Sequence, residues 1–433
     1  MIRAEYTIPG LHVREHEVQA PLDWADSSDP ARITVFAREV VDPVRRNDDL
    51  PLLLFLQGGP GGKSPRPTGP EGWIGEAIRT HRVILLDQRG TGRSSRIEGR
   101  RLEGIGDAAA QAAFLACFRA DSIVADAELL RTSVFGGRRW STLGQSYGGF
   151  VTLAYLSRAP EGLAACYVTG GLPSIRPDAA EVYRRTFPRI AGKNRAFAER
   201  YPQHVESLAR IADRLAAGDV RLPSGDALTV RRLQHVGLDL GMGAGFERLH
   251  YLFDEAFADD GELTTTFLAQ VETATAYSDN PLFAALHESI YASGPDATAW
   301  AAQAELERRP EFADDARPLL LTGESIHPWM FEEIRALRPF RGAVEHLAAR
   351  ADWPELYDAA RLAANEVPVV AAVYVDDMYV DADLQHDTLA ALGNARHLET
   401  NEFEHDGLRV GDVFARLRRL LDAHGGARAS STI

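Results

Sequence analysis

Short apolar runs alternate with stretches of helical pattern over the first 175 residues of the chain. Four strand-like runs each lead into a loop that contains glycine, at residues 52–56, 82–86, 140–143 and 165–169. The segments 107–134 and 150–157 between them have the composition of helices. Strands and helices in this alternation predict a parallel sheet of the α/β class, with functional loops at the carboxyl ends of its strands.

The two ends of the chain extend this sheet. Residues 5–8 and 33–38 have β-like alternation on either side of a turn region, which predicts an antiparallel start. Near the C-terminus we expect strands at 367–375 and 395–400 and helices at 382–392 and 410–423. The Gly-, Ala- and Ser-rich tail, residues 425–433, is expected to be frayed.

The middle of the chain has a different character. From about residue 177 to residue 350 a helical period dominates, and no convincing buried strand interrupts it. Helices are predicted at 196–200, 205–217, 246–257, 263–277, 281–291 and 299–308. The expected organisation is an α/β domain formed by residues 1–175 and 351–433, into which residues 176–350 are inserted as an all-helical cap.

Composition and charge narrow the class of protein. The 433 residues are 45% hydrophobic and 25% charged, which is ordinary for a globular protein with a full core. A net charge of −15 argues against a nucleic-acid or anionic-membrane partner, because both favour a basic surface. Cys117 and Cys166 are the two cysteines and do not form a disulfide framework. Without an apolar signal segment at the start or a membrane-length apolar run, a soluble, cytoplasmic protein is expected.

A G-x-S-x-G pattern at residues 144–148 joins the predicted strand 140–143 to the helix that follows it. This context is typical of a nucleophile elbow, although the bare pattern is a weak signal. A serine nucleophile needs a base and an oriented acid, which occur in the chain order Ser, acid, His in α/β hydrolases. Ser146, then Asp376 or Asp377, then His405 follow that order at the ends of predicted strands. The spacing alone does not choose between the two aspartates, and the inserted cap accounts for the long gap after Ser146.

The same fold needs N–H donors for the oxyanion that forms during acyl transfer. One donor is expected from Tyr147, the residue after the nucleophile, and the other from Gly59 in the glycine-rich loop 57–61. The chain has no G-x-x-x-x-G-K-[ST] phosphate loop. The acidic run 376–383 lacks the spacing of a calcium loop and has no His or Cys ligand pair nearby, so no metal or cofactor is expected.

These motifs resemble the prolyl aminopeptidases, or proline iminopeptidases, over nearly the whole chain. The family motif H-G-G-P-G occurs at residues 57–61 with Gln57 in place of His, and D-Q-R-G-x-G-x-S occurs intact at residues 87–94. The pair Asp377-Met378 and the late His405 also match, and this match favours Asp377 as the acid. The D-Q-R-G block is expected to pack beside the loop 57–61.

The chain departs from the short members of the family in two places. Gln145-Ser146-Tyr147 replaces G-S-W, and the cap lacks a W-E-x-W-E segment. It is similar instead to a longer-form subgroup, through residues 144–150, 286–291 and 404–409. The resemblance therefore carries over the triad and the oxyanion loop, whereas the residues that set specificity have to be found in this cap.

The resemblance implies release of an N-terminal proline from peptides with a free N-terminus. Relatives hold the substrate amine with cap glutamates, and Glu288 and Glu324 are the candidates here, with Tyr291 and Trp329 as candidate pocket walls. An esterase, an amidase or a tripeptide-releasing peptidase on the same scaffold is the alternative. A ligand-binding protein without turnover is less favoured, because the Ser, Asp and His set is intact. The sequence does not predict an oligomeric state.

Overall fold

The computed structural model describes residues 2–26 and 28–426, so most of the tail predicted to fray, residues 427–433, lies outside the described residues. Its centre is a nine-stranded sheet with the strand order β1-β2-β3-β5-β4-β6-β7-β8-β9. The strands are β1 (Ile2–Ile8), β2 (Leu11–Pro21), β3 (Arg32–Val41), β4 (Leu52–Leu56), β5 (Arg82–Asp87), β6 (Trp140–Gln145), β7 (Leu163–Thr169), β8 (Val369–Tyr374) and β9 (Ala395–Thr400).

The direction of strand pairing changes along the sheet as predicted. β1, β2 and β3 pair antiparallel, and β3 pairs antiparallel with β5. From β5 to β9 every pairing is parallel. The antiparallel start and the parallel α/β sheet are therefore both confirmed.

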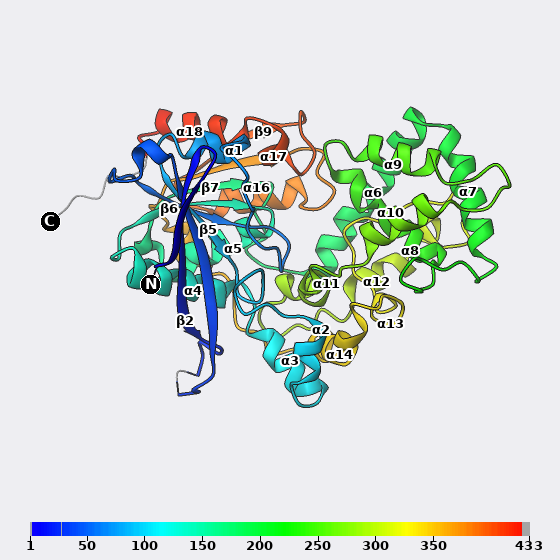
Figure 1. The fold of residues 1–433 in the computed structure, drawn as a ribbon, viewed down its shortest axis with the longest axis horizontal. Coiled ribbons are helices and arrows are strands. Elements are labelled where there is room, and N and C mark those ends of the chain that lie inside the picture. The colour runs from blue at the N-terminus through cyan, green and yellow to red at the C-terminus, as the bar shows by residue number, and fades with distance from the viewer. Residues whose placement is uncertain (1, 27, 427–433) are drawn as a thin grey trace.

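The continuous apolar runs follow from burial on both faces of the sheet. In β4 the side chains of Leu52, Leu54 and Leu56 belong to one core cluster, and those of Leu53 and Phe55 belong to the other. Helices α4 and α5 pack on one side, and α1 and α18 pack on the other (Figure 1). A strand that is buried on both faces has no face exposed to solvent, which explains why apolar and polar residues do not alternate along it.

Helices make up the rest of the regular structure. Those outside the middle segment are α1 (Gly72–Ala77), α2 (Gly99–Glu103), α3 (Ala108–Ala116), α4 (Ala120–Val134), α5 (Tyr147–Arg158), α15 (Ala359–Ala363), α16 (Ala382–Ala391), α17 (Gly407–Val410) and α18 (Val413–Ala423). The middle segment contributes α6 (Ala179–Arg200), α7 (Gln203–Leu215), α8 (Val230–Gln234), α9 (Gly245–Asp254), α10 (Thr265–Thr275), α11 (Pro281–Leu286), α12 (Ala301–Glu307), α13 (Met330–Glu333) and α14 (Arg341–Ala349).

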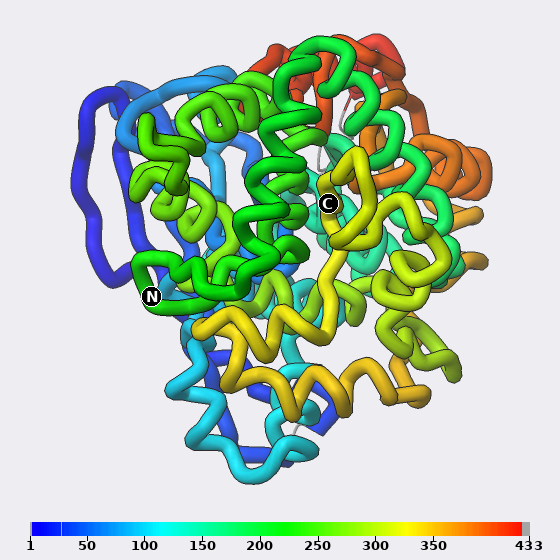
Figure 2. Tube along the Cα trace, turned by 90° about the vertical axis from the view of Figure 1, so that its right-hand side faces the viewer, coloured from blue at the N-terminus to red at the C-terminus, as the bar shows by residue number. Residues whose placement is uncertain are grey.

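The middle segment lies beside the carboxyl ends of the parallel strands. No strand of the sheet falls between Thr169 and Val369 in this fully described part of the chain. In Figure 1 helices α6 to α10 form a lobe to one side of the sheet, and in Figure 2 that lobe lies in front of it. The loops after β6, β8 and β9 therefore lie against helices of the middle segment.

Three predicted helices have different bounds in the structure. The helix expected at 107–134 is interrupted before Ala120, where Arg119 is extended, and the helix expected at 281–291 ends at Leu286 and continues as a 3-10 turn, Glu288–Tyr291. Helix α6 begins at Ala179, well before the predicted 196–200. Pro188 lies inside it, and a proline in this position normally argues for a helix end.

Membrane-length apolar helices were also sought in the described residues. No single helix there meets the length and hydropathy needed to cross a bilayer, although α3 and α4 together meet them as a pair bent by 52°.

Candidate active site

Ser146 occupies a strained turn between β6 and α5. Its φ of 54° and ψ of −127° lie outside the regions that a residue with a side chain prefers. Glycines around it allow the chains to approach closely: a Cβ on Gly148 would lie 1.9 Å from the carbonyl oxygen of Leu56, and one on Gly171 would lie 2.2 Å from that of Ser146. The predicted G-x-S-x-G segment thus forms a sharp strand-to-helix turn with the serine at its apex.

The loops after β8 and β9 bring an aspartate and a histidine together. Asp377 Oδ2 lies 2.7 Å from His405 Nδ1, and both side chains are buried. Asp377 Oδ1 accepts the backbone N–H groups of Tyr379 (2.8 Å) and Val380 (3.1 Å). Asp376 is exposed, so Asp377 is the aspartate that contacts the histidine.

The contact with Asp377 sets the tautomer of His405. The carboxylate of Asp377 accepts a hydrogen bond from the Nδ1–H group, so the lone pair of the neutral ring is on Nε2. Nε2 is buried and has no hydrogen-bond partner among the described residues. Burial acts to lower the pKa of His405, but the charge of Asp377 and the hydrogen bond to it raise that pKa above its ordinary value.

Neighbouring glycines place this pair beside Ser146. A Cβ on Gly170 would lie 3.3 Å from His405 Nδ1, whereas one on Gly171 would meet the backbone of Ser146. The backbone N–H of Ser146 also donates to the carbonyl of Thr169, the residue before this glycine pair (3.0 Å). Ser146, His405 and Asp377 therefore converge at the carboxyl ends of β6, β8 and β9.

The glycine-rich loop after β4 lies against the serine. A Cβ on Gly58 would be 2.9 Å from Ser146 Cβ, so this glycine is needed for the close approach. Gly59 has a φ of 131°, a conformation that favours glycine. Tyr147 begins α5, where the first N–H groups have no partner within the helix. Both predicted oxyanion donors thus belong to segments that flank Ser146.

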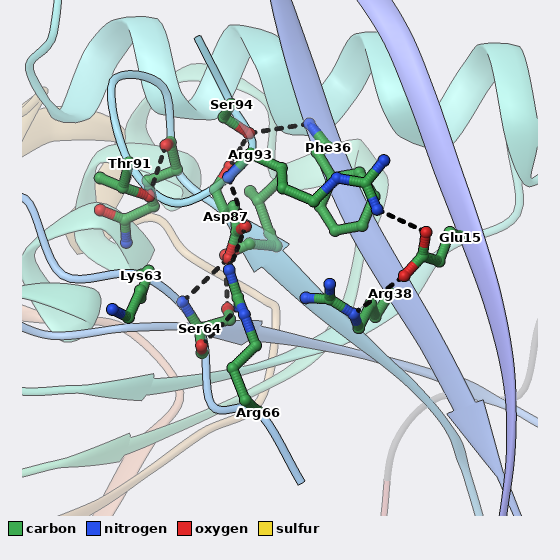
Figure 3. A network of polar contacts seen from close by, with 12 residues as sticks. Glu15, Phe36, Arg38, Lys63, Ser64, Arg66, Asp87, Thr91, Arg93 and Ser94 are labelled. Carbon is green, nitrogen blue, oxygen red and sulfur yellow. Dashed lines mark hydrogen bonds and ion pairs between the residues drawn. The ribbon is translucent and has the colours of Figure 1, made fainter. Parts of the chain in front are cut away.

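The D-Q-R-G block braces this loop, as predicted. Gln88 Nε2 donates to the carbonyl of Gln57 (2.8 Å), the first residue of the loop. Asp87 is buried and accepts from the backbone N–H of Ser64 (3.2 Å), from both terminal nitrogens of Arg66 (2.8 and 2.6 Å) and from the backbone N–H of Arg93 (2.9 Å) (Figure 3). The carboxylate of Asp87 therefore ties residues 64–66 to the block and bonds within the block to Arg93.

Two further residues of the block anchor it to the surrounding structure. Ser94 Oγ donates to the carbonyl of Asp87 (2.5 Å) and accepts the N–H of Phe36 on β3 (2.8 Å) (Figure 3). Arg89 is buried and pairs with Asp126 on α4 through two nitrogens (2.7 and 2.6 Å). Through these contacts the polar residues of the block hold it to β3 and α4.

Glu324 follows a residue that packs against the acid loop, because a Cβ on Gly323 would lie 2.9 Å from Met378 Cε, next to Asp377. Glu324 has no hydrogen bond or ion pair with any described residue, and its charge acts on both His405 and Asp377. Burial raises its pKa to about 7. The residue is half-buried and keeps some accessible surface.

Glu288, the other candidate carboxylate, is occupied by the cap itself. It accepts the backbone N–H groups of Ala301 (3.2 Å) and Ala302 (2.9 Å), the first residues of α12. Burial also raises the pKa of this carboxyl to about 7. Its contacts are those of a side chain that caps a helix N-terminus.

The two candidate aromatic residues have different surroundings. Tyr291 is buried and packs edge-on or tilted against Phe150, four residues after Ser146 on α5, and against Tyr183 of α6. Tyr291 also lines a narrow apolar cavity of about 20 Å³ that Phe150 and Tyr379 share. The ring of Trp329 contacts Arg231 and His327, and no recorded contact joins it to the triad loops.

Two aromatic residues of this region were not anticipated. Tyr379 packs edge-on against His405, with 4.8 Å between ring centroids, and Tyr183 has a buried hydroxyl without a partner among the described residues. The position of Tyr379, two residues after Asp377, was a usable signal. Tyr183 precedes Pro188 in the part of α6 that the sequence pattern did not predict, so no signal in the sequence pointed to Tyr183.

A larger cavity of about 810 Å³ lies elsewhere in the cap, with walls that include Leu238, Leu249 and Ala269.

Comparison with known proteins identifies the family. A model of the alpha/beta hydrolase fold matches residues 51–212. A proline iminopeptidase from Aeromonas sobria is 47% identical over 419 residues, which is 96% of this chain and 98% of that protein. A proline iminopeptidase from Aspergillus aculeatus is 32% identical over 408 residues, which is 92% of this chain and 90% of that protein. The chain therefore belongs to the proline iminopeptidase family and has the alpha/beta hydrolase fold that its motifs predicted.

Proposed function

We propose that this chain is a serine aminopeptidase that releases N-terminal proline from peptides with a free N-terminus. The observation that carries the proposal is the carboxylate of Glu324, which has no hydrogen bond or ion pair with any described residue and whose charge acts on the buried His405–Asp377 pair. A hydrolytic pair explains how an acyl bond is cut. A carboxylate without a partner in the described residues can pair with a substrate ammonium group, which an internal peptide bond lacks.

The reaction follows from the positions of the groups. Ser146 Oγ attacks the carbonyl of the N-terminal residue while His405 Nε2 takes the hydroxyl proton. Asp377 keeps the second ring nitrogen protonated and stabilises the imidazolium that forms. The backbone N–H groups of Gly59 and Tyr147 stabilise the oxyanion. His405 then protonates the leaving amine, and water, activated by the same histidine, releases the acyl group from Ser146.

Substrate selection is assigned to the cap side of the site. Glu324 binds the substrate ammonium group, and the positive charge of that ammonium group stabilises the ionised carboxylate of Glu324. The rings of Tyr291, Phe150 and Tyr379 line a narrow apolar cavity, and we assign to them the apolar contacts with the pyrrolidine ring of the substrate. We assign Glu288 to capping α12, because both carboxylate oxygens accept its N–H groups, and Trp329 to packing within the cap.

The test is steady-state turnover of prolyl- and alanyl-2-naphthylamide. We expect a higher kcat/KM for the prolyl substrate, and Ser146→Ala should lower kcat by roughly 10⁴-fold or more. A higher kcat/KM for the alanyl substrate would contradict the assignment to proline. Unchanged turnover by Ser146→Ala would contradict the serine mechanism.

A further inference from the structure

Three consecutive residues of the histidine loop bind the cap. Glu404 pairs through both carboxylate oxygens with Lys193 Nζ on α6 (2.7 and 2.5 Å). The next residue, His405, donates its backbone N–H to the carbonyl of Gly241 (3.0 Å). Asp406 Oδ1 then accepts the backbone N–H of Gly243 (2.9 Å). His405 is therefore held by the cap on both sides and at its own backbone.

The cap backbone approaches these loops too closely for larger residues. A Cβ on Gly241 would lie 2.4 Å from the ring of Tyr379, and one on Gly243 would lie 2.9 Å from Asp406 Oδ1. The acid loop is tied in the same way, because Arg189 on α6 donates to Asp381 Oδ2 (2.6 Å) and to the carbonyl of Val375 (2.9 Å). Helix α6 thus holds the loops of both Asp377 and His405.

The Lys193–Glu404 pair is the side-chain tie nearest to the histidine. Lys193 is 12% exposed and Glu404 is 27% exposed, so the pair is largely shielded from water. Such a pair contributes little net stability, because desolvation offsets the attraction, but it favours one geometry over others. Lys193 is one of only two lysines among 47 basic residues, the other being Lys63. Its compact ammonium sits between two oxygens of the residue that precedes His405.

We propose that the cap positions the catalytic histidine, and that Lys193 is a positioning residue that acts on His405 through Glu404. This inference rests on the proposed role of His405 as the base for Ser146. Lys193 does not bind substrate in this account. Its removal frees the loop around His405, and a displacement of the base of about 1 Å is enough to slow proton transfer strongly.

The experiment measures two rates in Lys193→Met: labelling of Ser146 by a fluorophosphonate, and turnover of prolyl-2-naphthylamide. Labelling needs the base but not the recognition of an amine, so it separates positioning from substrate binding. We expect the labelling rate and kcat to fall together, by roughly 10-fold, with KM changed less than about twofold. Lys193→Arg, which keeps the charge, should recover most of both rates, and so should the exchanged pair Lys193→Glu with Glu404→Lys.

A matched control is Arg317→Met, which breaks an exposed ion pair with Asp213 within the cap. It should leave both rates unchanged. Thermal unfolding of each variant distinguishes a displaced His405 from an unfolded protein. If Lys193→Met unfolds, Lys193→Arg and the exchanged pair still test the inference. Wild-type labelling by Lys193→Met, or a rise in KM alone, would overturn the inference. A wild type that fluorophosphonate does not label at Ser146 would overturn the proposed function and this inference with it.

Discussion

Glu324 and Glu288 are cap glutamates whose pKa values are both raised to about 7 by burial, but their surroundings differ. Glu288 accepts hydrogen bonds from the backbone N–H groups at the start of α12. Glu324 has no such partner among the described residues, and its charge acts on His405 and Asp377. A raised pKa means that the carboxyl stays protonated in the folded enzyme below about pH 7, and ionises above it.

This difference predicts a pH dependence of KM for prolyl-2-naphthylamide. The substrate ammonium pairs with the ionised carboxylate, so KM should fall as the pH rises through about 7 in the wild type. In Glu324→Gln the fall should vanish and KM at pH 8 should be higher by roughly 10-fold or more. Steady-state kinetics between about pH 5.5 and pH 8.5 provides the measurement.

Glu288→Gln is the matched control for that prediction. It keeps the wild-type KM profile and lowers the free energy of unfolding by about 1 kcal/mol, because the capping of α12 is weakened. The assignment of the two glutamates would be wrong if Glu288→Gln raised KM and Glu324→Gln did not.

At the residue scale, the sequence predicted those candidate catalytic residues that belong to a local motif. Ser146 lies in a glycine-flanked turn, and His405 follows the last strand, so order and spacing were enough to nominate both. Asp376 and Asp377 could not be separated by spacing, because the choice depends on which carboxylate turns inward, and the structure turns Asp377 toward the histidine. The contrast between Glu288 and Glu324 depends on contacts made by segments distant in sequence.

At the element scale, the elbow depends on how α5 packs against β4. Gly148 lies in α5, where alanine would ordinarily stabilise the helix by up to about 1 kcal/mol. A Cβ there would lie 1.9 Å from the carbonyl of Leu56, at the end of the strand that leads into the oxyanion loop. The clash involves backbone on both sides, so neither partner can move aside by changing a rotamer.

We therefore predict opposite effects of one substitution at two helical glycines. Gly148→Ala should lower the free energy of unfolding by about 1–3 kcal/mol and kcat by roughly 10-fold or more, because it displaces Ser146 from the oxyanion loop. Gly192→Ala in α6, whose added Cβ would lie 3.7 Å from the flexible end of Arg195, should be neutral or slightly stabilising. Denaturant unfolding and kcat test both. Equal stability of the two variants would show that the elbow is not closely packed.

Prediction of elements worked well for the sheet and less well for the cap. The parallel strands β4, β5, β7 and β8 are buried and rich in apolar residues, and the predicted strands coincide with β4 to β9. In the cap, α6 begins well before the predicted 196–200, and α11 ends at Leu286 within the predicted 281–291. Outside the cap, Arg119 is extended between α3 and α4, and its side chain reaches the carbonyl of Ala292 in the cap. Such ends follow from packing between distant segments and leave little trace in a local pattern.

At the scale of the whole molecule, we propose that the inserted segment joins cleavage to selection. The gap of about 230 residues between Ser146 and Asp377 was enough to predict an inserted cap. It could not show which helices face the triad, because that depends on how the cap folds over the loops after β8 and β9. In the structure helix α6 binds both of these loops, through Arg189 and Lys193, and the charge of Glu324 acts on the same histidine.

The central claim is that a cap carboxylate recognises a free substrate amine beside a serine triad. The most direct test compares kcat/KM for prolyl-2-naphthylamide with that for its N-acetylated form, at pH 8, in the wild type. Acetylation removes the charge that pairs with Glu324, so kcat/KM should fall by roughly 100-fold or more. Equal values of kcat/KM for the free and acetylated substrates would contradict the account.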